Sequence, residues 1–106
     1  MSKYLFRITF SLDGIRRLRG SSATAIKGGV AKMLEGVGGK IDAYYYAFGT
    51  DDIVGIVDVP DNVSAATVSI VANSAELAKV QVTPLLSVDE VDAAVEKGKG
   101  MSGPGG

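Results

Sequence analysis

The stretch YYYAFGTDDIVGIVDVP, residues 44–60, decides the fold of this chain. Its second half, Asp52 to Val59, has the alternation of a β-strand, yet it places Val54 and Ile56 on one face and further apolar residues on the other. The tyrosine-rich first half belongs to the preceding strand, which we expect over Ile41 to Phe48. The short turn at residues 49–51 joins the two strands. Because helices of the same chain cover one face of such a hairpin, a second copy is expected to cover the other.

Strand and helix patterns alternate on either side of this hairpin. Tyr4 to Phe10 has the period-two spacing of a strand, and a short helical pattern follows at Leu12 to Gly20. Ser22 to Val37 has apolar residues at the spacing of an amphipathic helix, and Asn62 to Asn73 repeats that pattern after Pro60. Leu77 to Leu86 reads as the last strand. The resulting order is βαββαβ.

This order predicts an α+β, ferredoxin-like fold, with a four-stranded antiparallel sheet and two helices on one of its faces. Ser87 and Glu90 form a capping box that begins a short C-terminal helix. We therefore expect one domain over residues 1–97 and a flexible Gly-rich tail over residues 98–106. The tail contains a G-x-G-x-x-G pattern, but the expected strand and helix do not flank it, so we do not interpret it as a dinucleotide site.

The composition excludes several classes of chemistry. The chain has 106 residues and contains neither cysteine nor histidine, which removes disulfides, thiolate ligands and the commonest general base. We expect no metal site and no cofactor. A formal net charge of −1 argues against a nucleic-acid partner, and no apolar run approaches the roughly 20 residues of a membrane span. We expect a cytoplasmic protein.

The face of the sheet without helices is the predicted functional surface. Each large apolar side chain left in water there forgoes about 1.5 to 3 kcal/mol, so we expect a homodimer, or a larger ring or filament, with two sheets closed into a dimeric α/β barrel. The interface candidates are Leu5, Tyr44, Tyr46, Phe48, Val54 and Ile56. The candidates for binding a small molecule in the barrel centre are Arg7, Thr9, Tyr44, Tyr46, Lys79 and Gln81.

Two functional hypotheses are compatible with these residues. The first is a homo-oligomeric protein that serves as an assembly module or binds a small ligand. The second is a cofactor-independent monooxygenase or isomerase that acts on a small organic molecule, using Tyr44 or Tyr46 with Arg7 and Asp42. An enclosed pocket lined by Arg7 and a tyrosine hydroxyl would favour binding or catalysis over assembly alone.

Two charged clusters have simpler interpretations. Asp51 and Asp52 follow a turn, where aspartate is common, and no further ligands lie nearby in the sequence to hold a metal ion. A group of arginines at residues 16–19 lies just before Ser21 and Ser22, and such a group can hold a phosphate or a carboxylate. We interpret it as a solvated basic turn.

Several segments of the chain resemble the GYD domain family. They are Gly38-Gly39-Lys40-Ile41, Tyr44-Tyr45-Tyr46-Ala47-Phe48-Gly49 with Asp52, Pro60-Asp61-Asn62 with Ser64-Ala65-Ala66, and Leu85-Leu86-Ser87 with Asp89-Glu90-Val91. The likeness covers most of residues 3 to 96. Asp51 stands where the Gly-x-Tyr-Asp-like signature has its tyrosine. The resemblance implies a small bacterial protein with a dimeric α/β barrel fold, and it supplies no catalytic residues.

Overall fold

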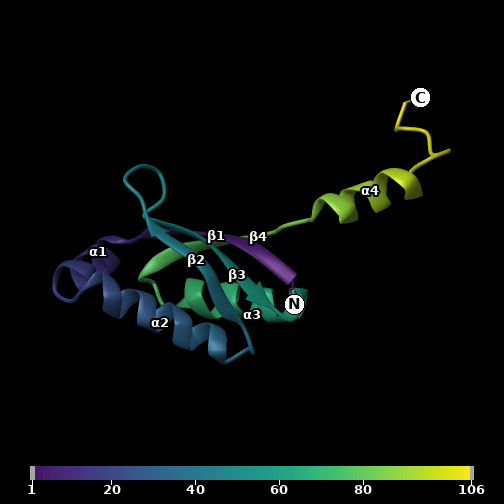
Figure 1. The fold of residues 1–106 in the computed structure, drawn as a ribbon. Helices are drawn as coiled ribbons and strands as arrows, with labels where there is room; N and C mark the ends of the chain where they lie inside the picture. The colour runs from purple at the N-terminus through teal and green to yellow at the C-terminus, as the bar shows by residue number, and fades with distance from the viewer. Residues whose placement is uncertain (1, 106) are drawn as a thin grey trace.

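The computed structural model describes residues 2–105 and has four strands and four helices (Figure 1). In chain order they are β1 (Ser2–Phe10), α1 (Leu12–Arg19), α2 (Ala23–Glu35), β2 (Lys40–Tyr46), β3 (Ile53–Val59), α3 (Asn62–Ser74), β4 (Ala78–Pro84) and α4 (Val88–Lys97). The strands form one antiparallel sheet in the order β2-β3-β1-β4. The predicted α+β fold with a ferredoxin-like order of elements is therefore confirmed.

Side-chain caps begin all four helices. Ser11, Ser22, Asp61 and Ser87 each accept a hydrogen bond from a backbone N–H in the first turn of the helix that follows, which satisfies a donor that the helix itself leaves free. The predicted capping box at the start of α4 is present, with both of its reciprocal hydrogen bonds. Among the described residues, none of these helices has the length and hydropathy needed to cross a bilayer.

Helices α2 and α3 lie on the same side of the sheet and create its covered face (Figure 1). The buried apolar side chains of β1 and β3 point to this side, with Ile53 and Val59 fully enclosed. Leu34 of α2 and Ala65 of α3 complete the core from the helix layer. The period-two pattern read in β1 and β3 thus assigned the buried residues of these two strands correctly.

Helix α4 is not part of this layered body. Figure 1 shows it projecting beyond the end of β4, away from the sheet and from the other helices. The Leu85 N–H donates to the Lys3 carbonyl at 3.0 Å, and the described hydrogen bonds of residues 86–105 all run between near neighbours in the sequence. Because α4 projects as an arm, the chain has a radius of gyration of 16.8 Å, whereas a compact domain of this length has about 13 Å.

The strand ends differ from the sequence prediction at the hairpin. Strand β2 stops at Tyr46, and Phe48 lies in the connecting loop with its ring fully exposed. The loop is longer than the predicted turn because the last backbone pairing joins the Ala47 N–H to the Asp52 carbonyl at 2.9 Å. Phe48 is consequently not a strand residue on either face of the sheet.

Candidate functional site: the open face of the sheet

The side of the sheet opposite α2 and α3 carries no helix, and we call it the open face. Antiparallel partners share a face, so the register groups its residues into rows that cross the strands. One row joins Gln81, Arg7, Val54 and Tyr45, and the next joins Thr83, Leu5, Ile56 and Ala43. Thr9 pairs with Lys79 beyond the first of these rows. Strands β1 and β3 provide the middle of this surface because they are the central strands of the sheet.

The centre of the open face is apolar. Leu5, Val54 and Ile56 are only partly buried, and the ring of Tyr45 beside them is 71% exposed. Val54 lies directly across from Tyr45 in the register. The structure therefore brings together three of the predicted interface residues and leaves them without a covering layer.

Arg7 gives the open face a cationic group beside this apolar centre. Its guanidinium lies 4.0 Å from an Asp51 carboxylate oxygen, and the side chains of both residues are partly exposed. Its Nε is buried and, within the described part of the chain, has no hydrogen-bond acceptor. Thr9 donates to the Thr50 carbonyl at 3.3 Å, which holds the loop after β2 near this place. An unpaired buried donor of this kind is costly.

The opposite end of the open face is held by charge pairs. The Lys3 ammonium donates to Asp42 at 3.0 Å and to Asp58 at 3.1 Å. These hydrogen bonds, first the one to Asp42 and then the one to Asp58, raise the pKa of Lys3 above its ordinary value of 10.5. Asp58 is itself buried, so Lys3 supplies the cation that a buried carboxylate requires.

Tyr44 and Tyr46 require a correction to the predicted site, because they point to the covered face. Tyr44 pairs with Gly55 and Tyr46 pairs with Ile53, two buried residues of β3. The ring of Tyr44 lies 5.9 Å from that of Phe6, centroid to centroid, within the helix-covered layer. The structure thus brings Arg7, Thr9, Lys79 and Gln81 together on the open face, and it separates the two tyrosines from them.

A β-bulge is the physical reason for this reversal. The pairing of β2 with β3 shifts between Ile41 and Ala43, which leaves Asp42 as an extra residue in β2. One extra residue exchanges the two faces for the part of a strand that follows it. Ile41 and Tyr44, which strict alternation would place on opposite faces, therefore both pack against the core.

The hydroxyl groups of the two tyrosines serve a structural purpose. The Tyr44 hydroxyl donates to the Tyr46 hydroxyl at 3.3 Å, and the latter donates to the Ala23 carbonyl at the start of α2 at 2.8 Å. Burial, followed by the hydrogen bond to Tyr46, raises the pKa of Tyr44 far above its ordinary value. A phenol that stays protonated is a poor general base, and Arg7 lies on the other side of the sheet. The described chain therefore does not assemble the groups of the enzyme hypothesis.

Two residues of the open face were missed in the sequence. The predicted interface and ligand-binding residues include neither Tyr45 nor Asp58. Gly55 carried a signal for the orientation, because a glycine inside a strand leaves room for large rings from its neighbours. Phe6 and Tyr44 occupy that room. A tyrosine paired with Gly55 lies on the covered face, which leaves Tyr45 for the open one.

Comparison with known proteins identifies a family for the chain. No curated protein and no solved structure shows significant similarity to the chain. A model of the GYD domain matches residues 4–95, which run from the third residue of β1 to near the end of α4. The match includes β3, most of β1 and the apolar centre of the open face. The chain therefore belongs to the GYD domain family.

Proposed function

We propose that this protein is a self-associating module in which two copies pack the open faces of their sheets against each other. The observation that carries the proposal is the apolar centre of that face, where Leu5, Val54 and Ile56 adjoin the exposed ring of Tyr45. Two facing sheets about 10 Å apart bury such side chains together. A two-fold axis lets the same patch serve both copies.

Arg7 supports the same arrangement. Its side chain is 44% exposed, and its guanidinium lies 4.0 Å from Asp51, while the surrounding face carries hydroxyl, amide and carboxylate groups. A facing copy brings acceptors of these kinds to the guanidinium. A pair of sheets would therefore add charge-assisted hydrogen bonds to the apolar contact.

Helix α4 gives the proposed assembly a second contact. Val88, Val91 and Val95 lie along one edge of the helix and are exposed. A helix of 10 residues is marginal in water by itself, and this one projects away from its own chain (Figure 1). In our proposal its valine edge packs against the second copy, so that each copy contributes an arm to the other.

Mass measurement on the purified chain tests the proposal. We expect light scattering coupled to size exclusion to give twice the 10.9 kDa of one chain for the natural sequence. Replacing Val54 and Ile56 together with lysine should give 10.9 kDa particles and raise the dimer dissociation constant at least about a hundredfold, since lysines would be buried without partners. Val63→Lys is the matched control, because Val63 is exposed on α3 and away from the open face.

Two further results decide the outcome. Circular dichroism should show that the lysine variant keeps its secondary structure, so that loss of mass reports loss of the contact. Val91→Lys should weaken the dimer without unfolding the body if α4 reaches the second copy. A natural chain that remains at 10.9 kDa at tens of micromolar would contradict the proposal, as would a lysine variant that keeps the doubled mass.

A further inference from the structure

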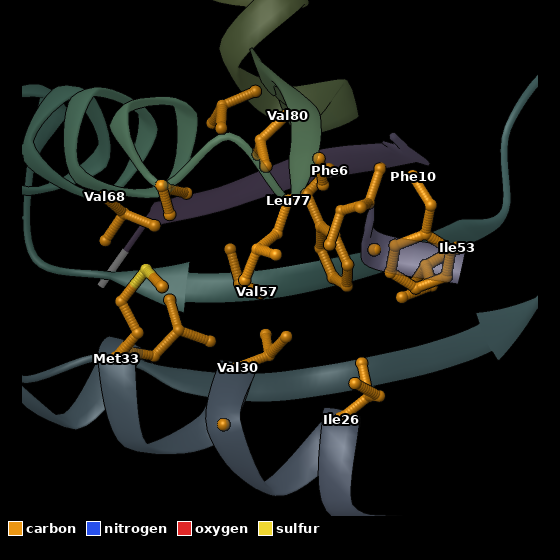
Figure 2. Close-up of a pocket in the computed structure, with 18 of the residues that line it drawn as sticks. Phe6, Phe10, Ile26, Val30, Met33, Ile53, Val57, Val68, Leu77 and Val80 are labelled. Atoms are coloured by element: carbon orange, nitrogen blue, oxygen red, sulfur yellow. The ribbon is translucent and has the colours of Figure 1, made fainter. Parts of the chain in front are cut away.

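A second region with the features of a binding site lies on the covered side of the sheet. A cavity lies between the sheet and helices α2 and α3 (Figure 2). Its volume is about 420 Å³. Phe6 and Val57 of the central strands contribute to one wall, Val30 and Met33 of α2 to another, and Val68 of α3 to a third. Pockets for small molecules commonly measure about 300 to 1,000 Å³.

The cavity exists because the two helices stand over different strands. Helix α2 packs mainly against β2, and α3 packs mainly against β4, which leaves a gap between the two helices over β3 and β1. Small residues keep the gap open, notably Gly29 on α2 and Ala65 and Ala72 on α3. A Cβ atom built on Gly29 would meet no atom within 4 Å. Gly29 belongs to the same helical stripe as Ile26 and Val30, which also line the cavity.

The chemistry of the lining is apolar with a cation at one end. Arg17 of α1 and Ser21, just after that helix, supply the polar side chains of the lining, and no carboxylate of the described chain lines it. Arg17 is exposed, so its guanidinium lies at the rim. Arg16 pairs with Asp13 at 3.8 Å, whereas Arg17 forms no ion pair within residues 2–105.

We propose that this cavity binds a medium-chain aliphatic carboxylate. The alkyl chain lies between α2 and α3 on the apolar floor of the sheet, and the carboxylate lies at the rim, where Arg17 and Ser21 donate hydrogen bonds to it. Water leaves the apolar lining when the chain enters, and the guanidinium matches a carboxylate in charge and geometry. The basic turn between residues 16 and 21 thereby gains a ligand. The site lies on the side of the sheet opposite to the proposed dimer contact and does not depend on it.

Isothermal titration of the full chain with decanoate, kept below its micelle concentration, tests the site. Gly29→Leu places a side chain in the cavity, and we expect it to weaken decanoate binding at least about fiftyfold. Gly28→Leu is the matched control. It makes the same exchange one residue earlier, where a new Cβ also meets nothing within 4 Å but where the residue does not line the cavity. We expect its affinity to stay within about twofold of the natural chain.

A second pair of variants tests the carboxylate position. Arg17→Gln should weaken decanoate binding about three- to fivefold, the effect expected for a partly exposed ion pair, and should leave decanol binding unchanged. Arg19→Gln removes the same charge from the same helix at a residue that does not line the cavity. It should alter neither ligand.

The following results would overturn the proposed carboxylate site. Failure of the natural chain to bind decanoate would remove the site, and so would equal affinities of the Gly29→Leu and Gly28→Leu proteins. Equal losses for decanol and decanoate in Arg17→Gln would remove the carboxylate from the assignment. If α4 of another copy filled the cavity, decanoate would bind only after Val91→Lys released it, which would replace the proposed ligand. The mass of Gly29→Leu should equal that of the natural chain, which separates this site from the dimer contact.

Discussion

The two faces of the sheet come from the same four strands, yet they meet very different surroundings. On the covered face, Ile53 and Val59 are fully enclosed, and tyrosine hydroxyls tie β2 to the start of α2. On the open face, Val54 and Ile56 stay partly exposed beside charge pairs at one edge. Neighbouring residues of β3 therefore differ in how far the chain itself buries them. Ile53 and Val59 are buried by their own chain, whereas Val54 and Ile56 are left partly exposed by it.

The largest expected effect is on the covered face, at Gly55. A Cβ atom there would lie 2.2 Å from the Ala43 carbonyl oxygen and 2.6 Å from the ring of Phe6. We expect Gly55→Ala to destabilise the fold by about 3 kcal/mol, because backbone and ring must both move, and to lower Tm by roughly 12 to 20 °C. Thermal unfolding followed by circular dichroism measures the loss.

Gly49→Ala provides the comparison for that variant. Gly49 lies in the loop after β2, and a Cβ atom there would meet nothing within 4 Å. Its Tm should change by less than about 4 °C. Similar losses for both variants would show that the close contact across β3 does not decide the stability of the covered face.

The same contrast explains what could be predicted from the sequence. Alternation in β1 and β3 placed Phe6 and Ile53 on one face and Leu5 and Val54 on the other, as the structure has them. The pairing of β1 with β3 has no bulge over residues 2–8, so simple alternation along the sequence is sufficient to assign their residues to the two faces. Strand β2 was ambiguous because tyrosine suits a buried layer and an exposed one equally well.

Other features depend on distances that no local pattern contains. The bulge at Asp42 follows from the pairing of two strands, and it exchanged the faces of Tyr44 and Tyr46. The capping box predicted that α4 forms, but not that it would project from the body. The apolar stripe of α2 predicted a buried side, whereas the cavity beneath it depends on how far α2 stands from α3. Packing geometry determines each of these.

Tyr46 on the covered face and Tyr45 on the open face allow a second comparison, in which we expect a smaller change in the free energy of unfolding. Tyr46→Phe removes the hydrogen bond to the Ala23 carbonyl, and we expect it to lower the free energy of unfolding by about 0.5 to 1.5 kcal/mol. Tyr45→Phe, the matched exchange on the open face, should change it by less than about 0.5 kcal/mol. Urea titration of both proteins at equal concentration measures the difference. Equal losses would mean that the two hydroxyls have equivalent surroundings, contrary to the separation of the faces.

The smallest expected effects are on the pH dependence of stability, which differs between the two sides of the sheet. Because the folded pKa of Lys3 is raised above 10.5, its ion pairs stabilise the open face below that pH, and the stabilisation disappears as pH rises through the folded pKa. Asp61, which begins α3 on the covered side, has a pKa lowered from 3.8 by hydrogen bonds from Ser64. Its contribution is present above 3.8 and disappears as pH falls through the lowered value.

Tm measured against pH for the natural chain and two variants separates these contributions. The advantage of the natural chain over Lys3→Met should hold at neutral pH and shrink as pH rises above 10.5 and through the raised pKa of Lys3. Its advantage over Asp61→Asn, which keeps a neutral capping group, should shrink only in acid, below the ordinary value of 3.8. Each variant should leave the opposite limb of the curve parallel to that of the natural chain, because Lys3 and Asp61 belong to different sides of the sheet. A Lys3→Met protein whose deficit persisted undiminished at high pH would show that Lys3 stabilises the open face by packing its methylenes and not through its charge.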